Sequence, residues 1–353
     1  MSELAQMLYD TAGRLFADAS TAEVINAAEK GEWPQALWAK LEELGLLDIL
    51  GDEAAGGGGG SWADVAALLR RVGEFSVPLP VAETILARWL AQQAGLSLPA
   101  GPATLALLEH PAALQAEGAG WKLGAPLAGV AWGRSAKAVV VAFEADGALR
   151  AGLLPIASAS EGRSVAGEPR DTLVPADTAF PARIVNGVSL DEVRAVGALT
   201  RVAMMAGAMQ RAMALSIRYA NERSQFGRSL FAFQAIQHHL AQIAEETCAA
   251  AVALELAAGN YSDDRATMTI AAAKVRAGEA AGKVAALAHQ IHGAMGVTYE
   301  HTLHHSTRRL WAWRDEYGRE DDWALRLWQD AAPQLGDGIW PLVVGATNRE
   351  AAG

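Results

Sequence analysis

The sequence predicts a mainly α-helical protein with one small β domain in its middle. Apolar residues recur at steps of three and four along both ends of the chain, whereas short β-branched runs and turn residues fill the central part. With 353 residues, 51% of them hydrophobic, the chain can bury a large core. We therefore expect an N-terminal helical domain (1–97), a middle β domain (98–187) and a C-terminal helical bundle domain (188–353).

The N-terminal segment has the apolar spacing of packed helices. A run of five glycines at 56–60 interrupts this spacing, and glycine loses the most backbone entropy on ordering, so we expect a mobile loop between two helices. The run lacks the preceding strand and the Lys-Ser/Thr pair of a phosphate-binding loop. The helical positions are Leu37, Leu41, Leu44 and Leu47, then Val65, Leu68, Leu69 and Val72.

The middle segment contains two strand-like runs, at 138–143 and 149–156. Asp146 and Gly147 stand between them, and an Asp-Gly pair between two such runs is a strong hairpin signal.

The C-terminal segment carries longer helical patterns and predicts a four-helix bundle. Gly259 to Asp264 (GNYSDD) has the composition of a connection between two of its helices. The residues of two helix faces are Val202, Met205, Met209 and Met213, then Ile236, Leu240, Ile243 and Thr247.

The composition argues against several classes of function. Lys and Arg number 29 against 40 Asp and Glu, with no basic block, so we expect no nucleic-acid partner. No uninterrupted apolar run of membrane-spanning length and no export signal is evident, so we expect no membrane insertion. The single cysteine, Cys248, lies in an apolar helical pattern, which suggests core packing and suits a cytoplasmic location.

Two short stretches suggest chemistry. Arg223 to Gly227 (RSQFG) is followed by 233–236 (FQAI), where a cation, an amide and a ring could hold a phosphate and stack on a flat heterocycle. An ordinary helix end explains this stretch equally well. The second stretch, His289 to Gly296 (HQIHGAMG), has small residues that would allow a close backbone approach, and it too could be a simple helix end.

Together these motifs resemble the C-terminal domain of the acyl-CoA dehydrogenase family, whose usual forms are R-x-x-F-G, Q-A-I or Q-x-I, and Q-x-x-G-G-x-G. The resemblance covers 199–318 well and continues weakly into 44–80. It implies helical, β and helical-bundle domains and an FAD cofactor. It also implies desaturation of an acyl-CoA thioester between its α and β carbons, in fatty acid or lipid catabolism.

The family's cofactor residues map onto the two motifs. The resemblance implies that the arginine binds the FAD pyrophosphate and that the glutamine of the last motif reaches the flavin nucleotide of a neighbouring subunit. Ala294 replaces the second glycine of the last motif, which would loosen the backbone approach. The implied cofactor-binding residues are Arg223, Gln225, Phe226, Gln234, Gln290, Gly293 and Gly296.

The catalytic base is the point where the sequence departs most from the family. The reaction needs a carboxylate over the α carbon in a dry pocket, and most members supply it from Tyr-Glu-Gly. The corresponding position here is Tyr317, so Glu316 becomes the candidate base, with Asp315 behind it. A solvated charged cluster is the competing interpretation, because one step along a helix turns a side chain by about 100°. The family's other base position corresponds to 197–201, which holds no acid.

The middle domain also lacks the family's flavin-lining Glu-x-x-x-Gly-Ser-Asp stretch, and only Glu109 remains as an isolated match. Such losses resemble the smaller subunits of hetero-oligomeric acyl-CoA dehydrogenases. Three hypotheses therefore stay open: an acyl-CoA dehydrogenase, a non-catalytic subunit that completes a partner's flavin site, or a flavin oxidase or monooxygenase of the same fold. The expected partners are the acyl-CoA substrate, an electron-transfer flavoprotein, and further subunits in a homotetramer or an α2β2 heterotetramer.

Two other clusters are better explained by packing than by a site. His301, His304 and His305 have spacing that could bind a metal, but apart from Glu300 no acid or cysteine joins them, so we expect no metal site. The tryptophans of the C-terminal end are expected in the core or at an interface. They are Trp311, Trp313, Trp323 and Trp328.

Overall fold

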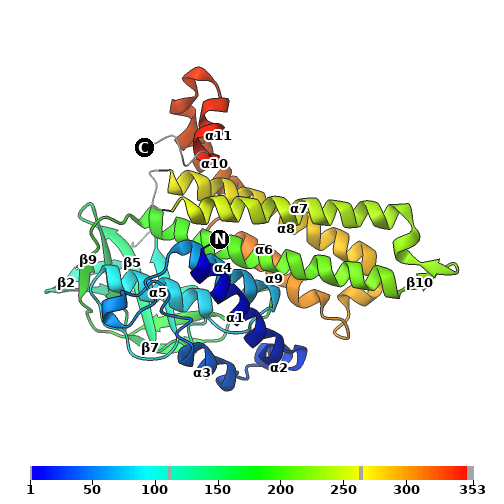
Figure 1. Cartoon of the computed structure of the whole chain (residues 1–353). Coiled ribbons are helices and arrows are strands. Elements are labelled where there is room, and N and C mark those ends of the chain that lie inside the picture. The colour runs from blue at the N-terminus through cyan, green and yellow to red at the C-terminus, as the bar shows by residue number, and fades with distance from the viewer. Residues whose placement is uncertain (1, 110–112, 262–264, 348–353) are drawn as a thin grey trace. The chain divides into compact units, whose positions relative to one another are not determined.

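A computed structural model describes residues 2–109, 113–261 and 265–347 of the chain (Figure 1). Backbone contacts divide the chain into two compact units. The first unit contains Met1–Ala22, Trp62–Val77 and Ala198–Gly353, and the second contains Glu23–Ser61 and Pro78–Gly197. The helices that the sequence predicts at both ends and the small β region between them are confirmed, whereas the two boundaries between the three predicted domains stay a prediction.

The first unit consists of helices and one short two-stranded hairpin. Its elements are α1 (Glu3–Ala19), α4 (Trp62–Glu74), α6 (Leu190–Glu222, which begins in the second unit), the hairpin of β10 (Ser224–Gln225) and β11 (Arg228–Ser229), η2 (Leu230–Ala232), α7 (Gln234–Gly259), α8 (Ala266–His292), η3 (Gly293–Val297), α9 (Leu303–Asp315), α10 (Glu320–Ala331), η4 (Ala332–Asp337) and α11 (Trp340–Thr347). Figure 1 shows α6, α7 and α8 running antiparallel, so the end of α6, the start of α7 and the end of α8 lie at one end of the bundle.

Most residues of the predicted helix faces lie in the bundle core, whereas Met213 and Ile236 are only partly buried. Val202, Met205 and Met209 are fully buried on α6, and Leu240 and Ile243 are buried on α7. Helix α4 packs directly against α6 because glycine replaces a side chain on each. A Cβ at Gly73 would collide with the backbone of Met204, and one at Gly207 would collide with the backbone of Arg70.

The second unit combines helices with short strands. Its helices are α2 (Ala22–Glu29), α3 (Gln35–Glu43), η1 (Glu53–Ala55) and α5 (Val81–Gln93). Its strands are β1 (Ala103–Leu108), β2 (Leu114–Glu117), β3 (Gly120–Leu123), β4 (Leu127–Ala131), β5 (Ala138–Ala145), β6 (Ala148–Leu153), β7 (Ile156–Ser160), β8 (Arg170–Pro175) and β9 (Ala182–Ile184). They form sheets of order β1-β5-β6-β9 and β4-β8-β7 and a β2-β3 hairpin. The buried residues of this core include Val141, Phe143 and Leu173.

Two predicted turns of the second unit are where the sequence places them. Asp146 and Gly147 both have positive φ, 53° and 72°, and join β5 to β6 with Ala145 paired to Ala148. The glycine run connects α3 and η1 to α4. Its amides are not free, because Gly58 donates to Asp48 and Gly60 donates to Ile49, and a Cβ at Gly57 would run into the Gly51 backbone.

Some individual expectations need correction or remain open. Cys248 is exposed on α7 rather than packed in the core, because it lies on the face of that helix opposite the buried Ile243 and Leu254. Trp313 and Trp323 are buried, whereas Trp311 and Trp328 are exposed. The predicted connection at 259–264 falls between α7 and α8, but residues 262–264 lie outside the described part of the chain. Within that part, no helix is long and apolar enough to cross a membrane.

Candidate functional site

The Arg223 motif forms a two-residue hairpin at the end of α6. Arg223 follows the last helical residue, and the Gln225–Arg228 pair closes the turn. Phe226 and Gly227 form the turn with φ of 53° and 78°, so a phenylalanine occupies a left-handed conformation that L-residues rarely adopt. Phe226 is 91% exposed, and Arg223 and Gln225 are exposed too. The motif therefore presents its cation, amide and ring to the surroundings of the chain.

The Gln290 motif forms the last turn of α8 and the 3-10 turn η3. Gln290 is exposed, and Gly293 has a φ of 58° and a ψ of −141°, a combination accessible only to glycine. Gly296 is buried, and a Cβ there would lie 2.9 Å from the His292 Cβ. Ala294 has no positive φ, so its methyl group does not strain the backbone at this position.

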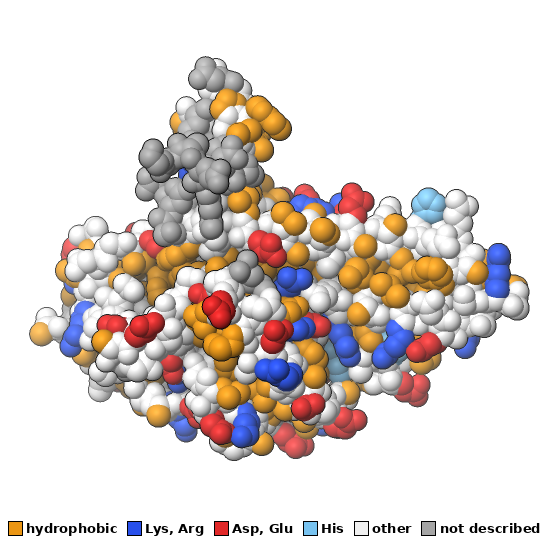
Figure 2. Space-filling view, in the orientation of Figure 1, with side chains coloured by type: hydrophobic (Ala, Val, Ile, Leu, Met, Phe, Trp, Pro, Cys, Tyr) orange, Lys and Arg blue, Asp and Glu red, His pale blue; other side chains and the backbone are white. Residues whose placement is uncertain are grey.

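The two motifs lie at the same end of the bundle. The Tyr219 ring on α6 stacks on the His292 ring on α8 at 4.5 Å, which places the two helix ends side by side. Gln234 is exposed at the first position of α7, at this same end. Figure 2 shows hydrophobic side chains gathered on the visible face between α6 and α7 toward the hairpin, and Ile217 and Phe231 are each 41% exposed.

Neutral histidines pack beneath this end. Burial lowers the pKa of His292 to about 4, and burial together with the nearby Arg309 lowers the pKa of His305 to about 3. Burial also lowers the pKa of His289, whose Nε2 lies 2.9 Å from the Thr307 hydroxyl. Among the described residues, no group of three or more histidine, cysteine or acidic side chains could hold a metal ion. Their arrangement is that of polar packing.

The bundle end has the features that a dinucleotide needs. A phosphate requires donors that are free to reach it, and the exposed Arg223 supplies a guanidinium. Close approach of a pyrophosphate requires backbone without a Cβ, and nothing lies within 4 Å of the position that a Cβ would take at Gly227 or Gly293. These residues therefore fit the nucleotide part of FAD as a set contributed from the outer surface of one chain.

The candidate base Glu316 lies at a different place, in the turn between α9 and α10. The helix ends at Asp315, and Glu316 has extended backbone angles (φ −76°, ψ 141°). The 100° rotation that separates neighbouring helical side chains therefore does not apply to it. Tyr317 and Gly318 follow with positive φ, 57° and 105°, and the Trp323 indole donates to the Tyr317 carbonyl at 2.9 Å.

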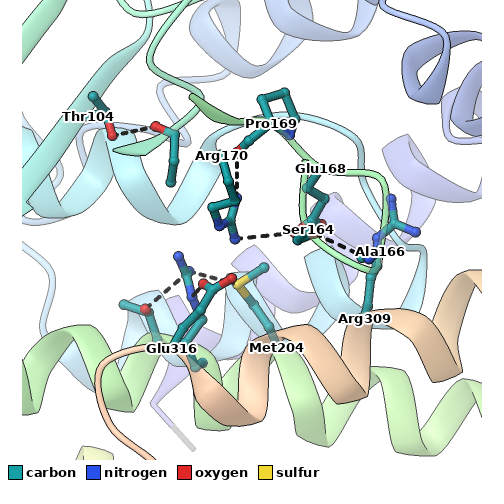
Figure 3. Close-up of polar contacts among 12 residues, drawn as sticks. Thr104, Ser164, Ala166, Glu168, Pro169, Arg170, Met204, Arg309 and Glu316 are labelled. Carbon is teal, nitrogen blue, oxygen red and sulfur yellow. Dashed lines mark hydrogen bonds and ion pairs between the residues drawn. The ribbon is translucent and has the colours of Figure 1, made fainter. Parts of the chain in front are cut away.

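A buried arginine binds the Glu316 carboxylate. The Arg201 Nε donates to Glu316 Oε2 at 2.6 Å, and the Arg201 side chain is only 1% exposed, against 19% for Glu316 (Figure 3). The same guanidinium lies 3.4 Å from the Met204 sulfur and 5.3 Å from the centre of the Tyr317 ring. Arg201 comes from the stretch of α6 where the family's alternative base would stand. The structure thus adds a cation to the predicted carboxylate.

A buried lysine holds the end of α9. The Lys274 ammonium on α8 donates to the Trp313 and Arg314 carbonyls at 3.2 and 2.6 Å. Burial lowers the pKa of Lys274 to about 8, while the nearby Glu320 and Glu316 act in the opposite direction. These carbonyls are among those that a helix C-terminus leaves without an intrahelical partner.

The two other acids that the sequence analysis named, Asp315 and Glu109, take part in exposed ion pairs. Asp315 is half exposed and pairs with Arg319 at 3.5 Å. In the second unit, Glu109 pairs with Arg194 at 3.5 Å. Sequence reasoning missed Arg201 and Lys274, because a single Arg and a single Lys inside helical patterns carry no motif. Only the absence of an acid at 197–201 drew attention to that stretch.

The fold and the two exposed motifs define a family of helical flavoproteins. The acyl-CoA dehydrogenase N-terminal domain matches residues 2–95, and the acyl-CoA dehydrogenase C-terminal domain matches residues 192–314. Together these matches cover more than half of the 353 residues. The chain belongs to the acyl-CoA dehydrogenase family of FAD-dependent oxidoreductases, as the resemblance of its motifs implied.

Particular relatives and solved structures agree with this assignment. The acyl-CoA dehydrogenase IpdE2 of Mycolicibacterium smegmatis is 28% identical over 315 residues, which are 86% of this chain and 91% of that protein. A chain of the ChsE4-ChsE5 complex from Mycobacterium tuberculosis has a TM-score of 0.84 at 23% identity, covering 94% of this chain and 98% of that one. Butyryl-CoA dehydrogenase from Megasphaera elsdenii has a TM-score of 0.82 at 18% identity, covering 94% and 99%. These two structures support the fold alone.

Proposed function

We propose that this chain desaturates an acyl-CoA thioester between its α and β carbons, with Glu316 as the base. The main observation behind this proposal is that α9 ends at Asp315, so Glu316 lies just beyond the helix. Its carboxylate is held 2.6 Å from the Nε of the buried Arg201. In this reaction the α C–H bond breaks, the proton goes to a Glu316 carboxylate oxygen, and the α carbon's electron pair forms the new double bond as the β hydrogen leaves as hydride. Bound FAD supplies the acceptor for that hydride.

We further propose that Arg223 and Gln290 hold FAD across a subunit boundary. Arg223 would bind the pyrophosphate, with Gln225, Phe226 and Gln234 beside it. Their exposure in the single chain supports this role, because donors that act on a neighbour's cofactor must face outward. Gly293 and Gly296 would keep the backbone close to the nucleotide.

The electron acceptor of the reduced cofactor is proposed to be an electron-transfer flavoprotein, and the assembly a homotetramer or an α2β2 heterotetramer. The exposed Phe226 and the hydrophobic face near the hairpin support an assembled state. The cytoplasmic compartment and a role in lipid catabolism stay predictions.

Purified protein and its absorbance spectrum test the proposal. Oxidised flavin bound to the protein should bleach when an acyl-CoA is added without oxygen. Glu316→Gln should keep the colour and slow bleaching by about 10²- to 10⁴-fold, the usual contribution of a general base. Glu255→Gln, an exposed acid on α7, is the matched control and should bleach normally. Normal bleaching by Glu316→Gln would remove Glu316 as the base.

A second function is favoured by the same ion pair. A guanidinium stabilises the ionised carboxylate and weakens it as a base, which suits a subunit that completes a partner's flavin site without performing the chemistry. Under this alternative, the protein purified alone is colourless and gains flavin only together with a partner chain. In that complex, Arg223→Ala would release flavin, whereas Glu316→Gln would leave bleaching unchanged.

A further inference from the structure

Two buried cations from different helices meet at the turn that carries Glu316. Arg201 comes from α6 and Lys274 from α8, and each side chain is 1% exposed. Removing a cation from water carries a large free-energy cost unless partners replace the lost hydration. Arg201 donates to the Glu316 carboxylate and also lies 3.4 Å from the Met204 sulfur, whereas Lys274 donates to the Trp313 and Arg314 carbonyls. Both cations therefore bind the same short segment, from Trp313 to Glu316.

The two cations act on different atoms of this segment. Arg201 binds the Glu316 side chain directly, through Nε and one carboxylate oxygen. Lys274 binds the Trp313 and Arg314 carbonyls, which belong to the backbone just before Glu316. One contact therefore sets where the carboxylate points, and the other sets where the chain leaves α9.

The turn needs such support because its own backbone is unusual. Tyr317 is a non-glycine residue at a φ of 57°, and Gly318 follows at 105°. Left-handed conformations are unfavourable for L-residues and persist when surrounding contacts fix them. On the far side of the turn, the Trp323 indole holds the Tyr317 carbonyl, and Arg314 pairs with Glu320 at 2.8 Å.

The electrostatic surroundings of Glu316 come from each of the helices packed against the turn. Among the charged groups on these elements, cations outnumber anions. The charged groups are Arg201 on α6, Lys274 on α8, Arg314 and Asp315 on α9, and Arg319 and Glu320 at the start of α10.

We propose that Arg201 and Lys274 are positioning residues for Glu316: Arg201 orients its carboxylate and sets its strength as a base, and Lys274 fixes the helix end from which it emerges. This inference rests on the proposed role of Glu316. An acyl thioester must reach the carboxylate while the Arg201 contact is loosened, so the strength of that contact controls how readily Glu316 accepts the proton. The side chains of both cations contact the segment that carries Glu316.

Hydrogen exchange tests the Lys274 part without any activity. Lys274→Met keeps the aliphatic stem and removes the donors, so the backbone amides of 313–318 should exchange at least about tenfold faster in the folded protein, because the turn opens more readily. Lys274→Arg keeps donors and charge and should restore part of the protection. Lys283→Met on the same helix, where the lysine is 58% exposed, is the matched control and should change nothing at the turn. Unchanged exchange in Lys274→Met would overturn the role of Lys274.

The pH profile of bleaching tests the Arg201 part. Arg201→Met should move the acid limb of the profile, where Glu316 takes up a proton, to higher pH by at least about one unit, since the stabilising cation is gone. Arg201→Lys keeps a charge and should move it less. A limb that stays in place in Arg201→Met would overturn the role of Arg201, and a lower rate with an unmoved limb would indicate a structural effect only.

A double-mutant cycle separates this inference from the function on which it rests. Unfolding of Arg201→Met, Glu316→Gln and the double variant should show non-additive midpoints if the pair is energetically coupled. If Glu316→Gln bleaches normally, while the midpoints are non-additive and the exchange result holds, Arg201 and Lys274 do position this turn and the base lies elsewhere. If the two single substitutions change the midpoint additively, Arg201 and Glu316 are not coupled, and the proposed role of Arg201 is wrong.

Discussion

Near its C-terminal end α8 packs among neutral buried histidines, whereas near its N-terminal end it contributes a buried lysine beside a charged turn. The two places are about 27 Å apart along the helix, from the rise per residue between Lys274 and His292. At the bundle end, burial lowers histidine pKa values until the side chains are uncharged at neutral pH. At the turn, the buried Arg201 pairs with Glu316.

The bundle end and the turn that carries Glu316 are therefore suited to different roles. Neutral histidines fill the interior of the bundle end, and Arg223, Gln225 and Gln290 are exposed on its outer surface, where a ligand can reach them. Charged packing at the turn fixes one carboxylate from within. A surface motif of the first kind can be recognised from sequence, whereas a buried ion pair of the second kind depends on residues that are distant in the chain.

Acid should lower the stability of the folded chain through the histidines at the bundle end, and we expect this effect to exceed the others. The folded pKa values of His292 and His305 lie near 4 and 3, below the usual value of 6.5, so the unfolded chain takes up protons that the folded chain does not. The free energy of unfolding therefore has its full value above pH 6.5. Below pH 6.5 it falls, by up to about 1.4 kcal/mol per pH unit for each histidine. Chemical unfolding between pH 7 and 4.5 measures this slope. His292→Phe should flatten it, and an equally steep slope in that variant would contradict the assignment.

Removing Arg223 should have the next largest effect, on cofactor retention rather than on the fold. Arg223→Ala loses charge-assisted hydrogen bonds to a phosphate, typically about 1.5 to 3 kcal/mol each. We expect FAD affinity to fall roughly 10- to 100-fold, measured by titration of the apoprotein in its assembled form. Arg326→Ala, which removes a surface cation paired with Asp330, is the control and should bind FAD as the wild type does. Equal affinity in both variants would separate the bundle end from the cofactor.

Alkaline pH should sharpen the contrast at the turn. Lys274 has a folded pKa of about 8 against the ordinary 10.5, so above pH 8 the folded chain releases a proton that the unfolded chain keeps. Between pH 8 and 10, the free energy of unfolding of the wild type should therefore rise relative to that of Lys274→Met, by up to about 1.4 kcal/mol per pH unit. Parallel unfolding curves for the two proteins supply the comparison. A constant difference across this range would mean that Lys274 keeps its proton.

The smallest expected effect concerns Phe226. Glycine tolerates a φ of 53° without the steric cost that an L-side chain carries, so Phe226→Gly should stabilise the single chain by up to about 1 kcal/mol. The same change removes an exposed ring and should weaken assembly or flavin retention. Unfolding midpoints and light scattering follow the two quantities. Unaltered assembly and flavin content would show that the Phe226 ring contacts neither another subunit nor the flavin.

Elements with local sequence signals could be predicted from the amino-acid sequence. Helical spacing located the buried faces of α6 and α7, the Asp146-Gly147 pair located a hairpin, and the two glycine-containing motifs identified the family. Each of these signals lies within a few residues of chain, where backbone preference and periodicity act directly.

Only the tertiary structure decided which side chains meet. Helical periodicity alone did not show that Cys248 faces outward, since burial of a small apolar residue depends on which helix covers it. The Arg201–Glu316 pair joins residues 115 positions apart, and the Lys274 contact to Arg314 joins residues 40 apart. The energy of such contacts arises when distant segments exclude water together, so neither stretch of sequence carries the information alone.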